Sequence, residues 1–139
     1  DKTGTVTKIL CENGQAVAEF LASHPKIAYV NYCGLPGDKY HAVAEKYLPN
    51  GSCGVVSFGV KGGREAAAAF MGHLKIAAIE THVADARTCC LHPASSTHRQ
   101  MNDEQLIAAG VQPDLVRMSC GLEDKNDLIH DIAQALDQI

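Results

Sequence analysis

The sequence predicts an α/β domain of two layers, in which helices cover one face of a sheet of about four strands. One observation is that β-branched and aromatic runs of strand length alternate with segments whose apolar residues recur at helical spacing. A second is the size and composition of the chain. Its 139 residues, 46% of them hydrophobic and 20% charged, are enough for one domain with one core. Strands that alternate with helices favour a sheet that the helices cover.

The first half of the chain predicts two helices and two strands. The apolar residues of 12–24 follow a helical period, and Pro25 ends that helix. A strand rich in aromatic and β-branched residues follows at 26–32. After a turn that contains Gly and Pro, we expect a short helix at 38–48 and a buried strand at 53–60.

The second half predicts an Ala-rich helix, three strands, a loop with a short helix, and a closing helix. In chain order these segments are the helix 62–74, the strands 76–83 and 86–93, the loop and helix 94–110, the strand 114–121 and the helix 124–139. Asn102 or Asp103 can cap the short helix and Gly110 can end it, while Asp124 can cap the closing helix. The apolar stripe of the closing helix predicts that it packs on the sheet.

Charge and hydropathy argue against two classes of partner. The net charge is −4 and the isoelectric point is about 5.9, so we expect no nucleic-acid partner and no anionic membrane surface. No run of 18 uninterrupted apolar residues occurs, and the first residues lack the apolar run of a signal peptide. We therefore expect a cytoplasmic protein.

The cysteines predict free thiols rather than disulfides or a metal site. None of the six forms a C-x-x-C pair, and most lie in apolar or strand-like runs: Cys11, Cys33, Cys53, Cys89, Cys90 and Cys120. Cys89 and Cys90 would point to opposite faces of one strand, which is unsuitable for a shared ligand. A zinc site from His92 and His98 is disfavoured, since no ligand pair completes it.

Three stretches resemble one family. They are "AYVNYCGLPGDKYHAVAEKYLPNGSCGVVSFGVKGG" (28–63), "DARTCCLHPASSTH" (85–98) and "GVQPDLVRMSCGLEDKNDLIHDI" (110–132). Together they are similar to the C-terminal domain of the pyridoxal-phosphate enzymes of cysteine and methionine metabolism, and most similar to the O-acetylhomoserine sulfhydrylases. The resemblance covers residues 11–139. It implies the small domain of these enzymes, with a largely antiparallel sheet.

The resemblance also implies a function for the full-length protein. Such an enzyme would make homocysteine from O-acetylhomoserine and sulfide, with pyridoxal 5'-phosphate held mainly by a preceding large domain. It would act as a homo-oligomer on an amino-acid substrate with a free α-carboxylate, and the isolated chain would be inactive. Alternatives are an enzyme of the methionine γ-lyase or cystathionine γ-synthase type, and a non-catalytic α/β module that binds a small acid.

Arg117 is the main candidate site residue. It stands in an apolar strand with no Asp or Glu at 115–119 to pair with it. The strand alone favours a solvated arginine at a sheet edge. The family resemblance implies instead that Arg117 binds the α-carboxylate of the substrate, for which the planar guanidinium is suited.

Other residues of the resemblance are weaker candidates. His82 matches a position near the substrate carboxylate where relatives often carry Ser or Asn, so it is either a substrate contact or a histidine that faces a loop. For His92, Ser96, Thr97 and His98, the alternatives are a lining of the substrate cleft and hydrogen bonding within turns.

Residues 1–10 form a segment without an assigned role. "DKTGTVT" is similar to the phosphorylation loop of P-type ATPases, in which Asp1 would be the phosphorylated carboxylate. "TVTKIL" is loosely similar to the Schiff-base segment of the pyridoxal-phosphate family, with Lys8 as the lysine. The third alternative is an ordinary tail before the domain at 11–139.

Overall fold

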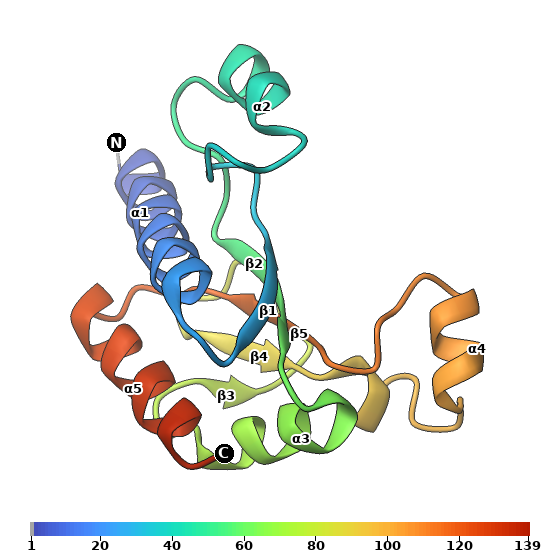
Figure 1. The fold of residues 1–139 in the computed structure, drawn as a ribbon. Helices are drawn as coiled ribbons and strands as arrows, with labels where there is room; N and C mark the ends of the chain where they lie inside the picture. The colour runs from blue at the N-terminus through green and yellow to red at the C-terminus, as the bar shows by residue number, and fades with distance from the viewer. Residues whose placement is uncertain (1) are drawn as a thin grey trace.

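A five-stranded sheet forms the centre of the domain in the computed structural model, which describes residues 2–139 (Figure 1). The strand order is β1-β2-β5-β4-β3. The strands are β1 (Ile27–Asn31), β2 (Val55–Val60), β3 (Ala78–Ile79), β4 (Cys89–Leu91) and β5 (Leu115–Ser119). All neighbours are antiparallel except β3 and β4, which are parallel. The prediction of a largely antiparallel sheet is therefore confirmed, and each of its five strands lies within one of the five predicted strand segments.

Three of the five helices, α1, α3 and α5, form a layer on one face of this sheet. The helices are α1 (Lys2–Ser23), α2 (His41–Tyr47), α3 (Gly63–His73), α4 (Asp103–Ala108) and α5 (Lys125–Asp137), and a 3-10 turn, η1, spans Pro93–Ser95. The helix α5 contacts both α1 and α3, α1 contacts β1 and β2, and α3 contacts β2 and β5. The short helices α2 and α4 project away from this layer (Figure 1). None of the helices within 2–139 is long and apolar enough to cross a membrane.

The core lies between the sheet and the three helices. Val56 and Phe58 of β2 and Val116 and Met118 of β5 are completely buried there. Phe58 meets Phe70 of α3 edge to face, with ring centroids 5.8 Å apart. Neighbouring residues of a strand point to opposite faces. Ser57, between Val56 and Phe58, and Arg117, between Val116 and Met118, therefore lie on the other face of the sheet. We call this other face the open face.

The first helix is longer than the sequence predicts, because it begins at Lys2 and not at residue 12. Its early turns are exposed and carry β-branched residues, which hide the helical period. Residues 2–7 are thus helical and do not form the loop of a phosphorylation site; Asp1 itself lies outside the described residues. Lys8 is exposed and pairs with Glu12 at 3.7 Å. The division of the chain after residue 10 stays a prediction.

The strands around residues 80–88 are shorter than expected. The predicted strands 76–83 and 86–93 reduce to the two residues of β3 and the three residues of β4. Between them, residues 80–88 form a loop, which we call the crossover loop, and its residue Ala84 has a positive φ of 58°. The loop leaves the sheet because several of its backbone groups bond to side chains and not to a neighbouring strand.

The helix ends follow the sequence closely. Asn102 caps α4 in a capping box with Gln105, and Asp124 caps α5 by accepting from the Asn126 N–H. The helix expected at 38–48 begins only at 41, because the Asp38 carboxylate accepts from Tyr40 N–H and holds the preceding residues in a turn.

Candidate functional site on the open face of the sheet

Arg117 lies in the middle of the open face, in a row of side chains that crosses four strands. It stands on β5, with Ser57 of β2 as its partner on one side and Leu91 of β4 on the other. Ser57 is in turn the partner of Asn31 on β1. Cross-strand partners point to the same face, so these side chains are neighbours there. The row places Arg117 between Ser57 and Leu91, on the face opposite the core.

The guanidinium of Arg117 has almost all of its hydrogen-bonding capacity left. Within residues 2–139, no carboxylate lies within ion-pair distance of it. Its one hydrogen bond is donated by Nη2 to the Thr81 carbonyl, at 2.8 Å. An arginine has five N–H donors in a planar fork, so the remaining donors can receive both oxygens of a carboxylate. The structure thus supports a ligand-binding role better than a structural ion pair.

The crossover loop is fixed beside Arg117 by hydrogen bonds to β5. The Thr81 carbonyl accepts from Arg117, and three residues later the Ala84 N–H donates to the Ser119 hydroxyl at 2.9 Å. Ser119 lies two residues after Arg117 on the same face of the strand. The loop therefore covers one end of the open face at a defined position.

The end of the crossover loop is attached to the segment between β5 and α5. Thr88 donates to the Glu123 carboxylate through both its N–H, at 2.8 Å, and its hydroxyl, at 2.7 Å. The Leu122 N–H donates to the Ala86 carbonyl at 2.8 Å. At Gly121 a side chain would not fit, since a Cβ there would lie 2.4 Å from the Ala86 oxygen. These contacts make the loop a fixed part of the domain.

His82 lies on the crossover loop directly after Thr81, which brings it to the same end of the sheet as Arg117. Its side chain is 63% exposed. Its Nδ1 lies 3.1 Å from Glu80 Oε2 and 3.5 Å from Asp85 Oδ2, so the ring is turned to carboxylates of its own loop. The structure brings the two predicted site residues together, and a substrate contact by His82 stays a prediction.

The comparisons with known proteins identify the family. A family model described as "Cys/Met metabolism PLP-dependent enzyme" matches residues 8–137.

The chain belongs to this family.

Several members of the family are similar over almost the whole chain. It is 44% identical over 128 residues to the O-acetyl-L-homoserine sulfhydrylase of Leptospira meyeri and 44% identical over 126 residues to the homocysteine synthase of Schizosaccharomyces pombe. It is 40% identical over 129 residues to an L-methionine gamma-lyase of Fusobacterium nucleatum subsp. polymorphum. These matches cover 91%, 91% and 93% of this chain, but only 29%, 29% and 32% of the relatives.

A solved structure of the family has the same fold. The crystal structure of an O-acetylhomoserine (thiol)-lyase from Campylobacter jejuni, which contains a pyridoxyl-lysine phosphate, superposes with a TM-score of 0.87 at 35% identity. The match covers 96% of this chain and 32% of that chain. The predicted family and the predicted fold are both confirmed.

The lysines whose side chains the structure describes do not provide the site that the family's cofactor requires. Within the described part of the chain, every lysine whose side chain is described is exposed except Lys26, which is partly buried. The Lys26 ammonium donates to the Leu136 and Ile139 carbonyls and so closes the end of α5. A Schiff-base lysine needs an amine that is free to react within an enclosed site. The Lys26 amine is engaged by two carbonyls, and the other lysines whose side chains are described are exposed. The described lysines therefore do not offer such a site by themselves.

The His-Pro-Ala-Ser segment after β4 is a structural element in this domain. His92 is buried, its Nε2 donates to the Pro113 carbonyl at 2.8 Å, and its Nδ1 lies 2.8 Å from the Ser95 hydroxyl. The Ser96 hydroxyl donates to the His92 carbonyl at 2.6 Å. Thr97 and His98 bond to each other. The turn hydrogen bonding that we considered for this segment is thus present.

Burial lowers the pKa of His92, and this predicts a pH dependence of stability. The unfolded chain binds a proton at His92 more readily than the folded chain does, so the free energy of unfolding should fall as the pH drops below about 6.5. The loss should continue until the pH passes the lowered pKa of the folded state. Denaturant titrations of wild type and His92→Gln over this range measure the difference. An identical slope in His92→Gln and wild type would contradict the prediction.

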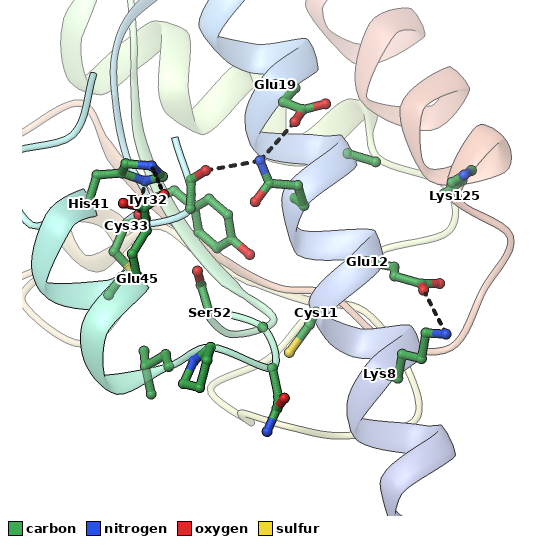
Figure 2. Close-up of a pocket in the computed structure, with 18 residues that line it drawn as sticks. Lys8, Cys11, Glu12, Glu19, Tyr32, Cys33, His41, Glu45, Ser52 and Lys125 are labelled. Carbon is green, nitrogen blue, oxygen red and sulfur yellow. Dashed lines mark hydrogen bonds and ion pairs between the residues drawn. The ribbon is translucent and has the colours of Figure 1, made fainter. Parts of the chain in front are cut away.

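A groove between α1 and α2 is the second feature that could hold a ligand, and sequence reasoning missed it. It has a volume of about 740 Å³ and its wall includes Cys11 and Glu19 of α1 and Glu45 of α2 (Figure 2). Its lining includes both acidic and basic side chains, and neither Arg117 nor His82 lines it. The groove comes from three separate segments of the chain, so no local pattern could have indicated it.

Proposed function

We propose that this chain is the C-terminal, substrate-binding domain of a pyridoxal-phosphate-dependent enzyme that makes homocysteine from O-acetylhomoserine and sulfide. The observation that carries the proposal is Arg117, a strand arginine on the open face with one hydrogen bond and, within residues 2–139, no carboxylate partner. The names of the most similar relatives support the reaction, since they include O-acetyl-L-homoserine sulfhydrylase and homocysteine synthase.

In this proposal the domain contributes recognition and orientation of the substrate. The guanidinium accepts the α-carboxylate in two parallel charge-assisted hydrogen bonds, which fix the plane of that group. The bond from Nη2 to the Thr81 carbonyl keeps the arginine from swinging along the strand. His82 follows Thr81 and is proposed to face the same carboxylate from the loop. Bidentate binding orients the reacting atoms of the amino acid and so lowers the entropic part of the barrier.

The cofactor would be held mainly by a large domain outside these residues, and it would supply the electron sink for the reaction. We further propose that the protein is a cytoplasmic homo-oligomer that uses neither nucleic acid nor membrane. This part of the proposal is supported by the lengths of the relatives, because the matches cover only 29–32% of them.

The alternatives differ in the reaction and not in the carboxylate contact. Identity to an L-methionine gamma-lyase is 40%, close to the 44% of the sulfhydrylase, so a lyase or a cystathionine γ-synthase type enzyme is the second candidate. A non-catalytic module that binds a small acid is the third. Assays of the full-length protein separate them: homocysteine from O-acetylhomoserine and sulfide supports the proposal, and methanethiol from methionine supports the lyase. Binding of amino acids without turnover would indicate the module.

The isolated 139-residue chain is expected neither to form a stable Schiff base with pyridoxal phosphate nor to turn over O-acetylhomoserine. The reason is that its described lysines are exposed or, for Lys26, bonded to α5. Borohydride reduction followed by mass spectrometry measures any adduct. A stoichiometric adduct on Lys8 would contradict the prediction and revive the alternative that Lys8 is the Schiff-base lysine.

A further inference from the structure

Four side chains at the base of the crossover loop have the composition of a metal site. Glu80, His82 and Cys89 each offer one ligand atom, and these atoms all lie within 4.8 Å of one another. Asp85 adds a second carboxylate, whose Oδ2 lies 3.5 Å from the His82 Nδ1. A thiol, an imidazole and carboxylates together are ligands of zinc and are poorly matched to magnesium or calcium.

The parallel pairing of β3 and β4 brings these groups together. Cys89 is the register partner of Ala78, and Glu80 follows Ala78 by two residues, so Glu80 and Cys89 point to the same side. The Glu80 N–H donates to the Cys90 carbonyl at 3.2 Å, which continues this alignment for one residue past β3. His82 follows Glu80 by two more residues, at the start of the loop. In the sequence, Cys89 lies well after Glu80 and His82, so the three residues do not form a recognisable metal-binding motif.

Two of the distances between the ligand atoms are close to those around a single tetrahedral ion. Glu80 Oε2 lies 3.1 Å from His82 Nδ1 and 3.9 Å from Cys89 Sγ. In a tetrahedral site with Zn–N and Zn–O near 2.0 Å and Zn–S near 2.3 Å, an oxygen, a nitrogen and a sulfur ligand are about 3.3–3.5 Å apart. The third pair, His82 Nδ1 and Cys89 Sγ, lies within 4.8 Å. The exposed His82 and Glu80 side chains would therefore have to move toward Cys89 by up to roughly an ångström to share one ion. Cys89 is buried, whereas Glu80 and His82 are exposed, so an ion can enter from solvent.

The loop that carries these ligands is already ordered by other contacts. Thr81, between Glu80 and His82, accepts the bond from Arg117, and Thr88, directly before Cys89, is bonded to Glu123. Ligands on a fixed backbone lose little conformational entropy when a metal binds.

We propose that Glu80, His82 and Cys89 form a zinc-binding site at the base of the crossover loop, with the fourth position open to solvent; Asp85 lies beside His82, outside this group of three. This proposal does not depend on the proposed enzymatic reaction, because the ion would take the Nδ1 of His82, which faces Glu80, and would leave its Nε2–H for the substrate carboxylate. A bound ion would connect Cys89 of β4 to Glu80 and His82, the residues on either side of Thr81. Because Thr81 accepts the hydrogen bond from Arg117, the ion would also stiffen this end of the open face.

The test is metal binding to the complete 139-residue chain after treatment with a chelator. We expect one Zn²⁺ per chain by competition with a chromophoric chelator, with no competition from Mg²⁺. Co²⁺ in place of zinc should give the strong visible bands of a tetrahedral site and a thiolate-to-cobalt charge-transfer band. Cys89→Ser should abolish that charge-transfer band.

His82→Asn provides a test that does not disturb the core, because this side chain is exposed. It should weaken zinc binding by about 100-fold or more, since even groups that only support a ligand change affinity by about 10- to 100-fold. Matched controls are Cys33→Ser and His73→Asn, which should bind zinc as the wild type does. The proposal is overturned if His82→Asn binds with unchanged affinity, if Cys89→Ser keeps the charge-transfer band, or if Cys33→Ser loses it.

Discussion

Replacement of Arg117 by alanine in the full-length enzyme is expected to lower kcat/KM for O-acetylhomoserine by about 10-fold to more than 100-fold. The variant removes the proposed bidentate contact to the α-carboxylate. A hydrogen bond to a charged group contributes about 1.5–3 kcal/mol, and about 1.4 kcal/mol corresponds to a tenfold change in rate. Arg117→Lys should recover only part of the loss, because an ammonium keeps the charge and loses the planar fork.

The fold should tolerate these substitutions. Among the described residues, Arg117 makes one hydrogen bond, to the Thr81 carbonyl, and it is not part of the hydrophobic core. Steady-state kinetics and thermal unfolding of the same variants separate the two roles of the residue. Arg99→Ala, an exposed arginine after the His-Pro-Ala-Ser segment, is the matched control and should leave both quantities unchanged. A lower melting temperature with intact kinetics would show instead that Arg117 is structural.

Gly121→Ala is expected to lower the free energy of unfolding by about 3 kcal/mol or more. A Cβ at this position would lie 2.4 Å from the Ala86 oxygen and 2.5 Å from the Arg87 carbonyl carbon and the Thr88 nitrogen. All three are backbone atoms, so no side-chain rotation relieves the contact, and the crossover loop must move away. Overpacking of a well-packed site costs about 1–3 kcal/mol, and a clash with backbone belongs at the upper end of that range.

Gly72→Ala is the matched control for this prediction. Gly72 lies in α3, and a Cβ there would meet nothing within 4 Å. Alanine in the interior of a helix is more favourable than glycine by about 0.5–1 kcal/mol, so this variant should be as stable as wild type or more so. Denaturant titration of both variants measures the effect. Wild-type stability in Gly121→Ala would mean that the loop does not rest on Gly121.

Displacement of the loop has a second expected consequence for Gly121→Ala. Since the Thr81 carbonyl and His82 travel with the loop, the full-length variant should also lose substrate affinity, whereas Gly72→Ala should not. A loss confined to stability would show that the crossover loop does not contribute to the substrate site.

The sequence by itself determined the parts of this protein that depend on near neighbours. The apolar runs at 53–60 and 114–121 predict two strands, and β2 and β5 lie within them. The caps of α4 and α5 are equally local, because a capping side chain bonds to the backbone two or three residues away. The three family stretches carried the assignment to the pyridoxal-phosphate enzymes.

Only the tertiary structure decided how the candidate site is built. The strand pattern of 76–83 and 86–93 would continue β3 and β4, but residues 80–88 instead bond to Arg117, Ser119 and Glu123, which lie 35 or 36 positions away from their partners. The same loop gathers Glu80, His82 and Cys89 into one cluster. A local pattern reports which face of an element is buried. It carries no information on which distant polar groups will form hydrogen bonds with the backbone of a loop, because that depends on how the strands pair.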